Sequence, residues 1–186
     1  GSARHDSLNK KLARAAHAGA KAAGAEATFV DLDDYPMPIY HGDLEVASGM
    51  PQMARELRAL LLAHDGLLIA SPENNSSISA LLKNTIDWLS RDVEDGKGDS
   101  SGLAPWRGKV AGLMAASPGG FGGIRALPHL RQILATLGVT VLGTQVAVPR
   151  AHEAFAADGS LADERVAKSL RSLAEAVTRA AQRLRG

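Results

Sequence analysis

Residues 66–77 read GLLIASPENNSS, an unbroken apolar run that changes abruptly into a polar loop. The same change occurs at 110–123, where VAGLMAA is followed by the glycine-rich SPGGFGG. Strands that are apolar at every position, rather than at every second one, are covered on both faces of the sheet. These two stretches therefore predict parallel strands, each followed by a loop at its carboxyl end.

Helical spacing of apolar residues alternates with such runs along the rest of the chain. Because strands that alternate with helices form parallel βαβ units, the expected fold class is α/β, a three-layer, doubly wound parallel sheet. An acidic and glycine-rich stretch at 92–108 predicts an exposed excursion. The predicted helices span 7–23, 50–64, 79–90, 125–137 and 161–184, and the further strands span 27–30 and 139–148.

The first predicted helix begins at residue 7 with no strand before it. A doubly wound sheet normally starts with a strand whose following loop carries a phosphate site, and residues 1–9 have the character of that loop. We therefore expect the first strand to be missing from this chain. The alternative is that Gly1 and Ser2 are an expression remnant that no strand preceded.

Composition excludes several classes of function. The 186 residues predict a single domain, 1–186, and the absence of cysteine excludes disulfides, thiolate metal sites and a cysteine nucleophile. A net charge of +1 argues against a nucleic-acid surface. No apolar run reaches the roughly 20 residues that span a bilayer, and no signal peptide is visible, so we expect a cytoplasmic protein without membrane contact. The six histidines show no metal-ligand spacing, so we expect no metal site.

Ligands of open parallel sheets bind beyond the carboxyl ends of the strands, and three loops here have that position. The first, GSARHDSLN at 1–9, precedes a predicted helix. A helix start presents free N–H groups and a partial positive charge, which favour phosphate, and Ser2, Arg4, Ser7 and Asn9 could add hydrogen bonds. The alternative interpretation is that Ser7 only caps the helix and that Arg4 is solvated.

The second loop, 71–77, is polar at every position except Pro72, which suits hydrogen bonding to a planar polar ring. Its alternative is an ordinary turn in which Ser76 or Ser77 caps the next helix. The third loop, 117–123, has four glycines, which allow a ligand to approach the backbone closely. Its alternative is a flexible surface loop.

Together these residues resemble the NADPH-dependent FMN reductase family, whose fold is flavodoxin-like. The family pattern G-S-x-R-x-x-S-x-N is matched within 1–9, S-P-E-Y-N-x-S…L-K-N-x-I-D-W-x-S-R within 71–91, and S-P-G-G-x-G-G at 117–123. One position departs from the pattern, because Asn74 stands where the family usually has tyrosine.

The resemblance implies how the loops would hold FMN. The first loop would bind the phosphate, the second would line one side of the isoalloxazine, and the third would line its other edge. No side chain is implied as a catalytic acid or base, because the flavin carries the chemistry. The implied cofactor-binding residues are Ser2, Arg4, Ser7, Asn9, Pro72, Glu73, Asn74, Asn75, Ser77, Ser117, Gly119, Gly120 and Gly122.

The implied function is an NAD(P)H-dependent reductase that passes hydride equivalents through FMN to a flavin, quinone or similar small acceptor. Members of the family commonly form dimers or tetramers, so we expect a homodimer or homotetramer. An alternative function is a flavodoxin-like electron carrier without substrate chemistry of its own. Carriers usually show a strongly acidic docking surface, however, and this chain is nearly neutral. A flavin-free interaction protein that keeps only the fold is a third possibility.

Overall fold

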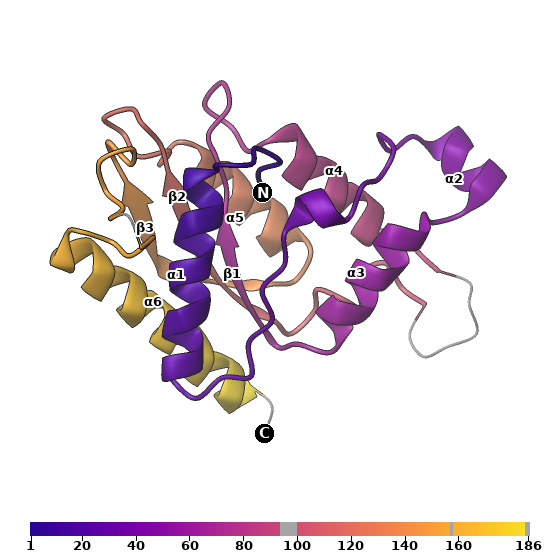
Figure 1. The fold of residues 1–186 in the computed structure, drawn as a ribbon. Helices are drawn as coiled ribbons and strands as arrows, with labels where there is room; N and C mark the ends of the chain where they lie inside the picture. Colours follow the sequence, from indigo (N-terminus) through magenta and orange to yellow (C-terminus); the bar gives the residue numbers. More distant parts are fainter. Residues whose placement is uncertain (94–99, 157, 185–186) are drawn as a thin grey trace.

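The computed structural model describes residues 1–93, 100–156 and 158–184 (Figure 1). Three parallel strands form one sheet in the order β1-β2-β3, with bounds Gly66–Ala70, Val110–Ala116 and Thr140–Val148. Two helices, α1 (Leu8–Ala22) and α6 (Glu164–Leu184), cover one face of the sheet. On the other face, α5 (Ala126–Thr136) packs against β2 and β3. Helices α3 (Gln52–Leu62) and α4 (Ala80–Leu89) pack against each other and contribute to the same apolar core. The predicted three-layer α/β architecture is confirmed.

The central strand β2 separates two apolar cores. Every residue of β2 is buried, and successive side chains point to opposite faces of the sheet. Leu113 packs into the core beneath α3, α4 and α5, whereas Met114 packs into the core beneath α1 and α6. β1 is more exposed than β2, because it is an edge strand in the part of the chain that the structure describes.

The predicted strand at 27–30 is wrong, because a strand needs a hydrogen-bonded neighbour and this segment has none among the described residues. The segment packs instead against α1. The guanidinium of Arg14 lies 4.2 Å from the centre of the Phe29 ring, and the ring of His17 bonds to the carbonyl of Ala27. A short helical turn (Leu32–Asp34) follows, and helix α2 (Gly42–Ser48) lies beyond it.

Residues of the long motif, in α4 and just after it, form hydrogen bonds to the segment that precedes α2. The Asn84 amide donates to the Pro38 carbonyl at 2.9 Å and accepts from the Tyr40 N–H at 2.8 Å. The buried Trp88 indole donates to the same carbonyl, and Arg91 donates to the Tyr40 hydroxyl. These contacts give this half of the motif a packing role away from the three loops.

The predicted excursion at 92–108 is only partly an excursion. Residues 94–99 lie outside the described part of the chain. The flanking residues turn back onto the core, where Val93 and Trp106 are both buried and the Trp106 indole donates to the Leu89 carbonyl. Across the described ranges, no helix combines the length and the hydropathy that a bilayer crossing requires.

Candidate functional site

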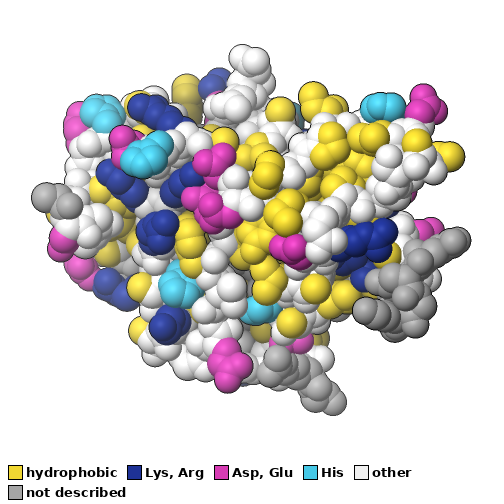
Figure 2. All heavy atoms as spheres, turned by 45° about the vertical axis from the view of Figure 1, so that its right-hand side comes forward, with side chains coloured by type: hydrophobic (Ala, Val, Ile, Leu, Met, Phe, Trp, Pro, Cys, Tyr) yellow, Lys and Arg dark blue, Asp and Glu magenta, His cyan; other side chains and the backbone are white. Residues whose placement is uncertain are grey.

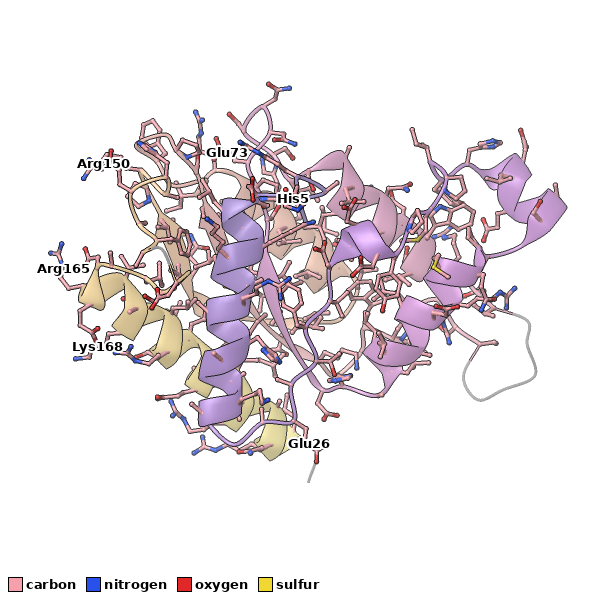
Figure 3. The ribbon with its side chains drawn as sticks, in the orientation of Figure 1. His5, Glu26, Glu73, Arg150, Arg165 and Lys168 are labelled. Carbon is pink, nitrogen blue, oxygen red and sulfur yellow. The ribbon has the colours of Figure 1, made fainter. Side chains whose placement is uncertain are left out.

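The structure brings the three predicted loops together at the carboxyl edge of the sheet. The Ser71 N–H donates to the Met114 carbonyl, so the second loop leaves β1 beside the end of β2. The Ser117 N–H donates to the Val148 carbonyl, which places the third loop beside the end of β3. The first loop is attached to the same edge, because the Ser79 hydroxyl donates to the Gly1 carbonyl. Figure 3 shows His5 of the first loop and Glu73 of the second at this edge.

The first loop ends in a capped helix start. The Ser7 hydroxyl accepts from the Lys10 N–H at 3.3 Å, so the capping interpretation of Ser7 holds, and only 4% of the residue is exposed. The first turn of α1 contains no acidic residue that would offset the partial positive charge of the helix start. Ser2 and Arg4 lie in the loop just before it, and the Arg4 side chain is exposed.

Two cationic side chains, Lys10 and Arg4, lie near this helix start, and they differ in whether a carboxylate is already paired with them. Lys10 forms an ion pair with Asp31 at 2.8 Å, and this hydrogen bond raises the pKa of Lys10. Arg4 has no carboxylate partner within the described residues. Arg4 is therefore the residue of this loop that has a cationic group free for an incoming anion.

Asn9 lies beneath the loop rather than on its surface. Its buried amide donates to the Ala116 carbonyl at 2.8 Å and accepts from the Ala116 N–H at 2.9 Å. Ala116 is the last residue of β2, so these two bonds join the start of α1 to the end of the central strand. The geometry supports a positioning role for Asn9.

The second loop is a tight turn with an unusual backbone. Asn75 and Ser76 both have positive φ, 50° and 64°, and Asn74 and Ser77 exchange two backbone hydrogen bonds around them. Positive φ at both central residues is the signature of a type I′ turn. The alternative that Ser76 or Ser77 caps α4 is wrong, because the Ser79 hydroxyl accepts from the Leu82 N–H and performs that role.

Glycines of the third loop serve two different purposes. A Cβ on Gly122 would lie 2.8 Å from backbone atoms of Val148 and Pro149, and one on Gly123 would lie 2.9 Å from the Cβ of Ala115. Both glycines also have positive φ, so the loop is packed against the sheet and is not simply flexible. Gly119 and Gly120 are exposed, and a Cβ on Gly120 would meet nothing within 4 Å. The open half of the loop is therefore the half that a ligand can approach.

An ion pair joins the second loop to Arg125, the residue that immediately precedes α5. The Glu73 carboxylate accepts from the Arg125 Nε at 2.7 Å and from the Arg125 backbone N–H at 3.0 Å, and it also pairs with Nη2. The Glu73 side chain is only 7% exposed, and the hydrogen bond from Arg125 lowers the pKa of the carboxyl. A second link joins the Ser77 hydroxyl to the His129 ring at 2.9 Å. Arg125 and His129 could not be identified from the sequence, because both follow the third loop and meet their partners only in the folded chain.

The assembled edge fits an anionic group at one end and a planar polar ring beside it. The α1 start and Arg4 supply donors and positive charge for a phosphate. The exposed Gly120 N–H has no acceptor among the described residues and is available to a heteroatom of a ring. No cluster of three or more metal-ligating side chains occurs within the described ranges.

The chain is similar in sequence to known FMN reductases and quinone reductases. The sequence model of the NADPH-dependent FMN reductase family matches residues 1–153. The chain is 38% identical to an NAD(P)H-dependent FMN reductase of Pseudomonas aeruginosa over 151 residues, which are 81% of this chain and 76% of the relative. It is 32% identical to a 2-hydroxy-1,4-benzoquinone reductase of a Burkholderia species, over 92% of this chain and 87% of the relative.

Among solved structures, the chain is similar to FerB, a flavoenzyme NAD(P)H:(acceptor) oxidoreductase from Paracoccus denitrificans. The TM-score is 0.79 at 32% identity, and the match covers 98% of this chain and 94% of FerB. The similarity therefore includes the whole sheet and the three loops.

The two kinds of glycine in the third loop predict different effects of alanine. Gly122→Ala should lower the free energy of unfolding by about 2 kcal/mol or more, because its Cβ would meet immovable backbone at positive φ. Gly120→Ala should change it by less than about 0.5 kcal/mol, because the added methyl group lies in open space. Urea denaturation of both variants measures the difference, and equal losses would contradict the assigned packing.

The Glu73–Arg125 pair predicts a specific pH dependence of stability. Because the folded-state pKa of Glu73 lies below its ordinary value of 4.5, the stabilisation is fully present above pH 4.5 and is lost as pH falls through the lower folded-state pKa. Glu73→Gln should lower the free energy of unfolding at pH 7 by about 1–3 kcal/mol and should flatten this acid dependence.

The matched control is Glu26→Gln, since Glu26 is exposed at the opposite end of the molecule (Figure 3). Urea denaturation between pH 7 and pH 3 should leave the control parallel to the wild type. A Glu73→Gln variant that keeps the wild-type acid dependence would show that the pair does not contribute.

Proposed function

The chain belongs to the NADPH-dependent FMN reductase family, and from this premise we propose how its three loops work. Family membership makes the chain an NAD(P)H-dependent oxidoreductase that uses FMN to reduce flavins or quinones. Three features that suit FMN meet at one edge of the sheet: a helix start that can bind a phosphate, a polar turn, and a glycine-rich loop with an exposed backbone.

In this proposal the first loop holds the FMN phosphate. The phosphate lies at the start of α1, where Ser2, Arg4 and Ser7 donate hydrogen bonds to its oxygens. Charge-assisted bonds of this kind are about twice as strong as neutral ones. Asn9 contributes from below, because its bonds to Ala116 fix the helix start relative to the sheet.

The other two loops hold the isoalloxazine. The second loop lines one side of the ring and the third lines its other edge. Donors fixed by packed loops stabilise the negative charge that develops on the ring, and they need no reorganisation to do so. When bound, FMN supplies the two-electron chemistry between nicotinamide and acceptor. The residues assigned to the ring are Pro72, Glu73, Asn74, Asn75, Ser77, Ser117, Gly119 and Gly120, and Gly122 supports them by packing the third loop against the end of β3.

We also propose that residues 1–186 form one domain that associates as a homodimer or homotetramer in the cytoplasm. Large apolar side chains are exposed around α2, with Ile39 84% and Val46 90% exposed. Figure 2 shows hydrophobic side chains gathered on the face that includes this region. A contiguous apolar surface of this kind is typical of an association surface.

Anaerobic addition of NADPH tests the proposed function. The purified protein loaded with FMN should be yellow and should bleach when NADPH is added, because hydride transfer reduces the flavin. An added quinone should restore the colour. A yellow protein that NADPH cannot bleach, but that a separate reductase can, would indicate an electron carrier. A protein that does not bind FMN would contradict both flavin functions.

Arg4→Ala tests the phosphate end of the proposed site. Loss of one charge-assisted hydrogen bond should weaken FMN binding by about 10- to 100-fold, while the exposed position of Arg4 keeps the fold intact. Lys168→Ala, on the outside of α6 (Figure 3), is the matched control and should bind FMN as the wild type does.

Ser7→Ala should differ from Arg4→Ala, because it also removes the cap of α1 and costs about 1 kcal/mol of stability. Calorimetric titration with FMN measures the affinities, and thermal unfolding measures the stabilities. An Arg4→Ala variant with unchanged affinity would contradict the assignment of the phosphate to this loop.

A further inference from the structure

Phe121 places an exposed aromatic ring at the edge of the site. It is the only Phe, Tyr or Trp in the three loops, and 69% of the residue is exposed. It lies between the open half of the third loop and the packed Gly122. Covering an exposed apolar ring with a flat ligand removes apolar surface from water, and this stabilises the complex.

The position of the ring is supported by a fixed cation. The Arg125 guanidinium carbon lies 5.3 Å from the centre of the Phe121 ring, within the range of a cation–π contact. Arg125 is in turn held by the Glu73 carboxylate, whose side chain is almost fully buried. The ring and the guanidinium therefore form one ordered surface, which we call the Phe121–Arg125 shelf.

One side of Arg125 remains free. The Nε and Nη2 atoms and the backbone N–H all face Glu73, whereas Nη1 has no acceptor among the described residues. The Arg125 side chain is 55% exposed. The shelf thus offers an apolar face and, next to it, a hydrogen-bond donor of a charged group.

The charge of the shelf suits the quinone better than the hydride donor. The nicotinamide ring of NAD(P)H is uncharged and becomes positive as it gives up its hydride, a change that a nearby guanidinium disfavours. A quinone has carbonyl oxygens that accept hydrogen bonds and that become more negative on reduction, which a guanidinium favours. Asn74, which precedes the two central residues of the turn in the second loop, has no ring with which to stack on either substrate.

We propose that the Phe121–Arg125 shelf is the acceptor subsite and that it selects planar quinones. The Phe121 ring stacks on the face of the quinone, and Arg125 Nη1 donates a hydrogen bond to one of its carbonyl oxygens. Phe121 is therefore a specificity-determining residue. This inference rests on the proposed function, because it needs FMN in the site beside the shelf.

Calorimetric binding of 1,4-naphthoquinone to the FMN-loaded protein tests the subsite without turnover, since no hydride donor is present. Phe121→Ala should raise the Kd of the quinone by about five- to tenfold, and Phe121→Leu should raise it less. The Kd of FMN and the rate of flavin bleaching by NADPH should stay within about twofold of the wild type, because the shelf contacts neither in this scheme. Leu184→Ala, which removes a comparably exposed apolar side chain at the far end of α6, is the matched control.

The outcomes separate this inference from the proposed function. If FMN-loaded wild type binds the quinone and Phe121→Ala binds it equally well, the acceptor subsite is overturned while the reductase function stands. A changed oligomeric mass of Phe121→Ala, measured by light scattering, would identify the ring as a subunit contact and would also overturn the subsite. A wild-type protein that does not bind FMN would overturn the proposed function and the subsite with it.

Discussion

The bonds between the Asn9 amide and the backbone of Ala116 hold the start of α1 against the end of β2. The residues are 107 positions apart in sequence, and both groups of Ala116 are satisfied by one buried side chain. Removing that amide would leave a buried N–H and a buried C=O without partners, which costs about 1–3 kcal/mol for each group. The start of α1, with its free N–H groups, is therefore held in a fixed position relative to the sheet. A phosphate bound there would lie at a defined distance from the other two loops.

The other two loops are also fixed to the sheet and to each other. Glu73 and Arg125 connect the second loop to the start of α5, and Gly122 allows the third loop to pack against the end of β3. A loop held in this way loses little conformational entropy when a ligand binds. Rigid backbone donors are what a redox ring needs, since the ring takes up a hydride, and with it one negative charge, while the surrounding atoms stay in place. This explains how a site with few aromatic residues and no evident catalytic side chain can serve flavin chemistry.

Much of this arrangement could be predicted from the sequence, because it depends on local patterns. The apolar runs at 66–70 and 110–116 are strands, and each of the three loops is found at the predicted edge. Predictions failed where a partner distant in the chain decides the structure. Residues 27–30 have strand-like composition but no neighbouring strand among the described residues. The bonds between Asn9 and Ala116 also could not be predicted, because the two residues are 107 positions apart. Arg125 could not be assigned a role, because nothing in its local sequence shows that Glu73, 52 positions away, faces it.

We propose that the start of α1 recognises the phosphate of a flavin. The most direct measurement compares FMN with riboflavin, which has the same ring system without the phosphate, by calorimetric titration of the flavin-free protein. If Ser2, Arg4 and Ser7 hold the phosphate, FMN should bind about a hundredfold more tightly than riboflavin, and the difference should shrink in Arg4→Ala. Equal affinities for FMN and riboflavin would contradict the account.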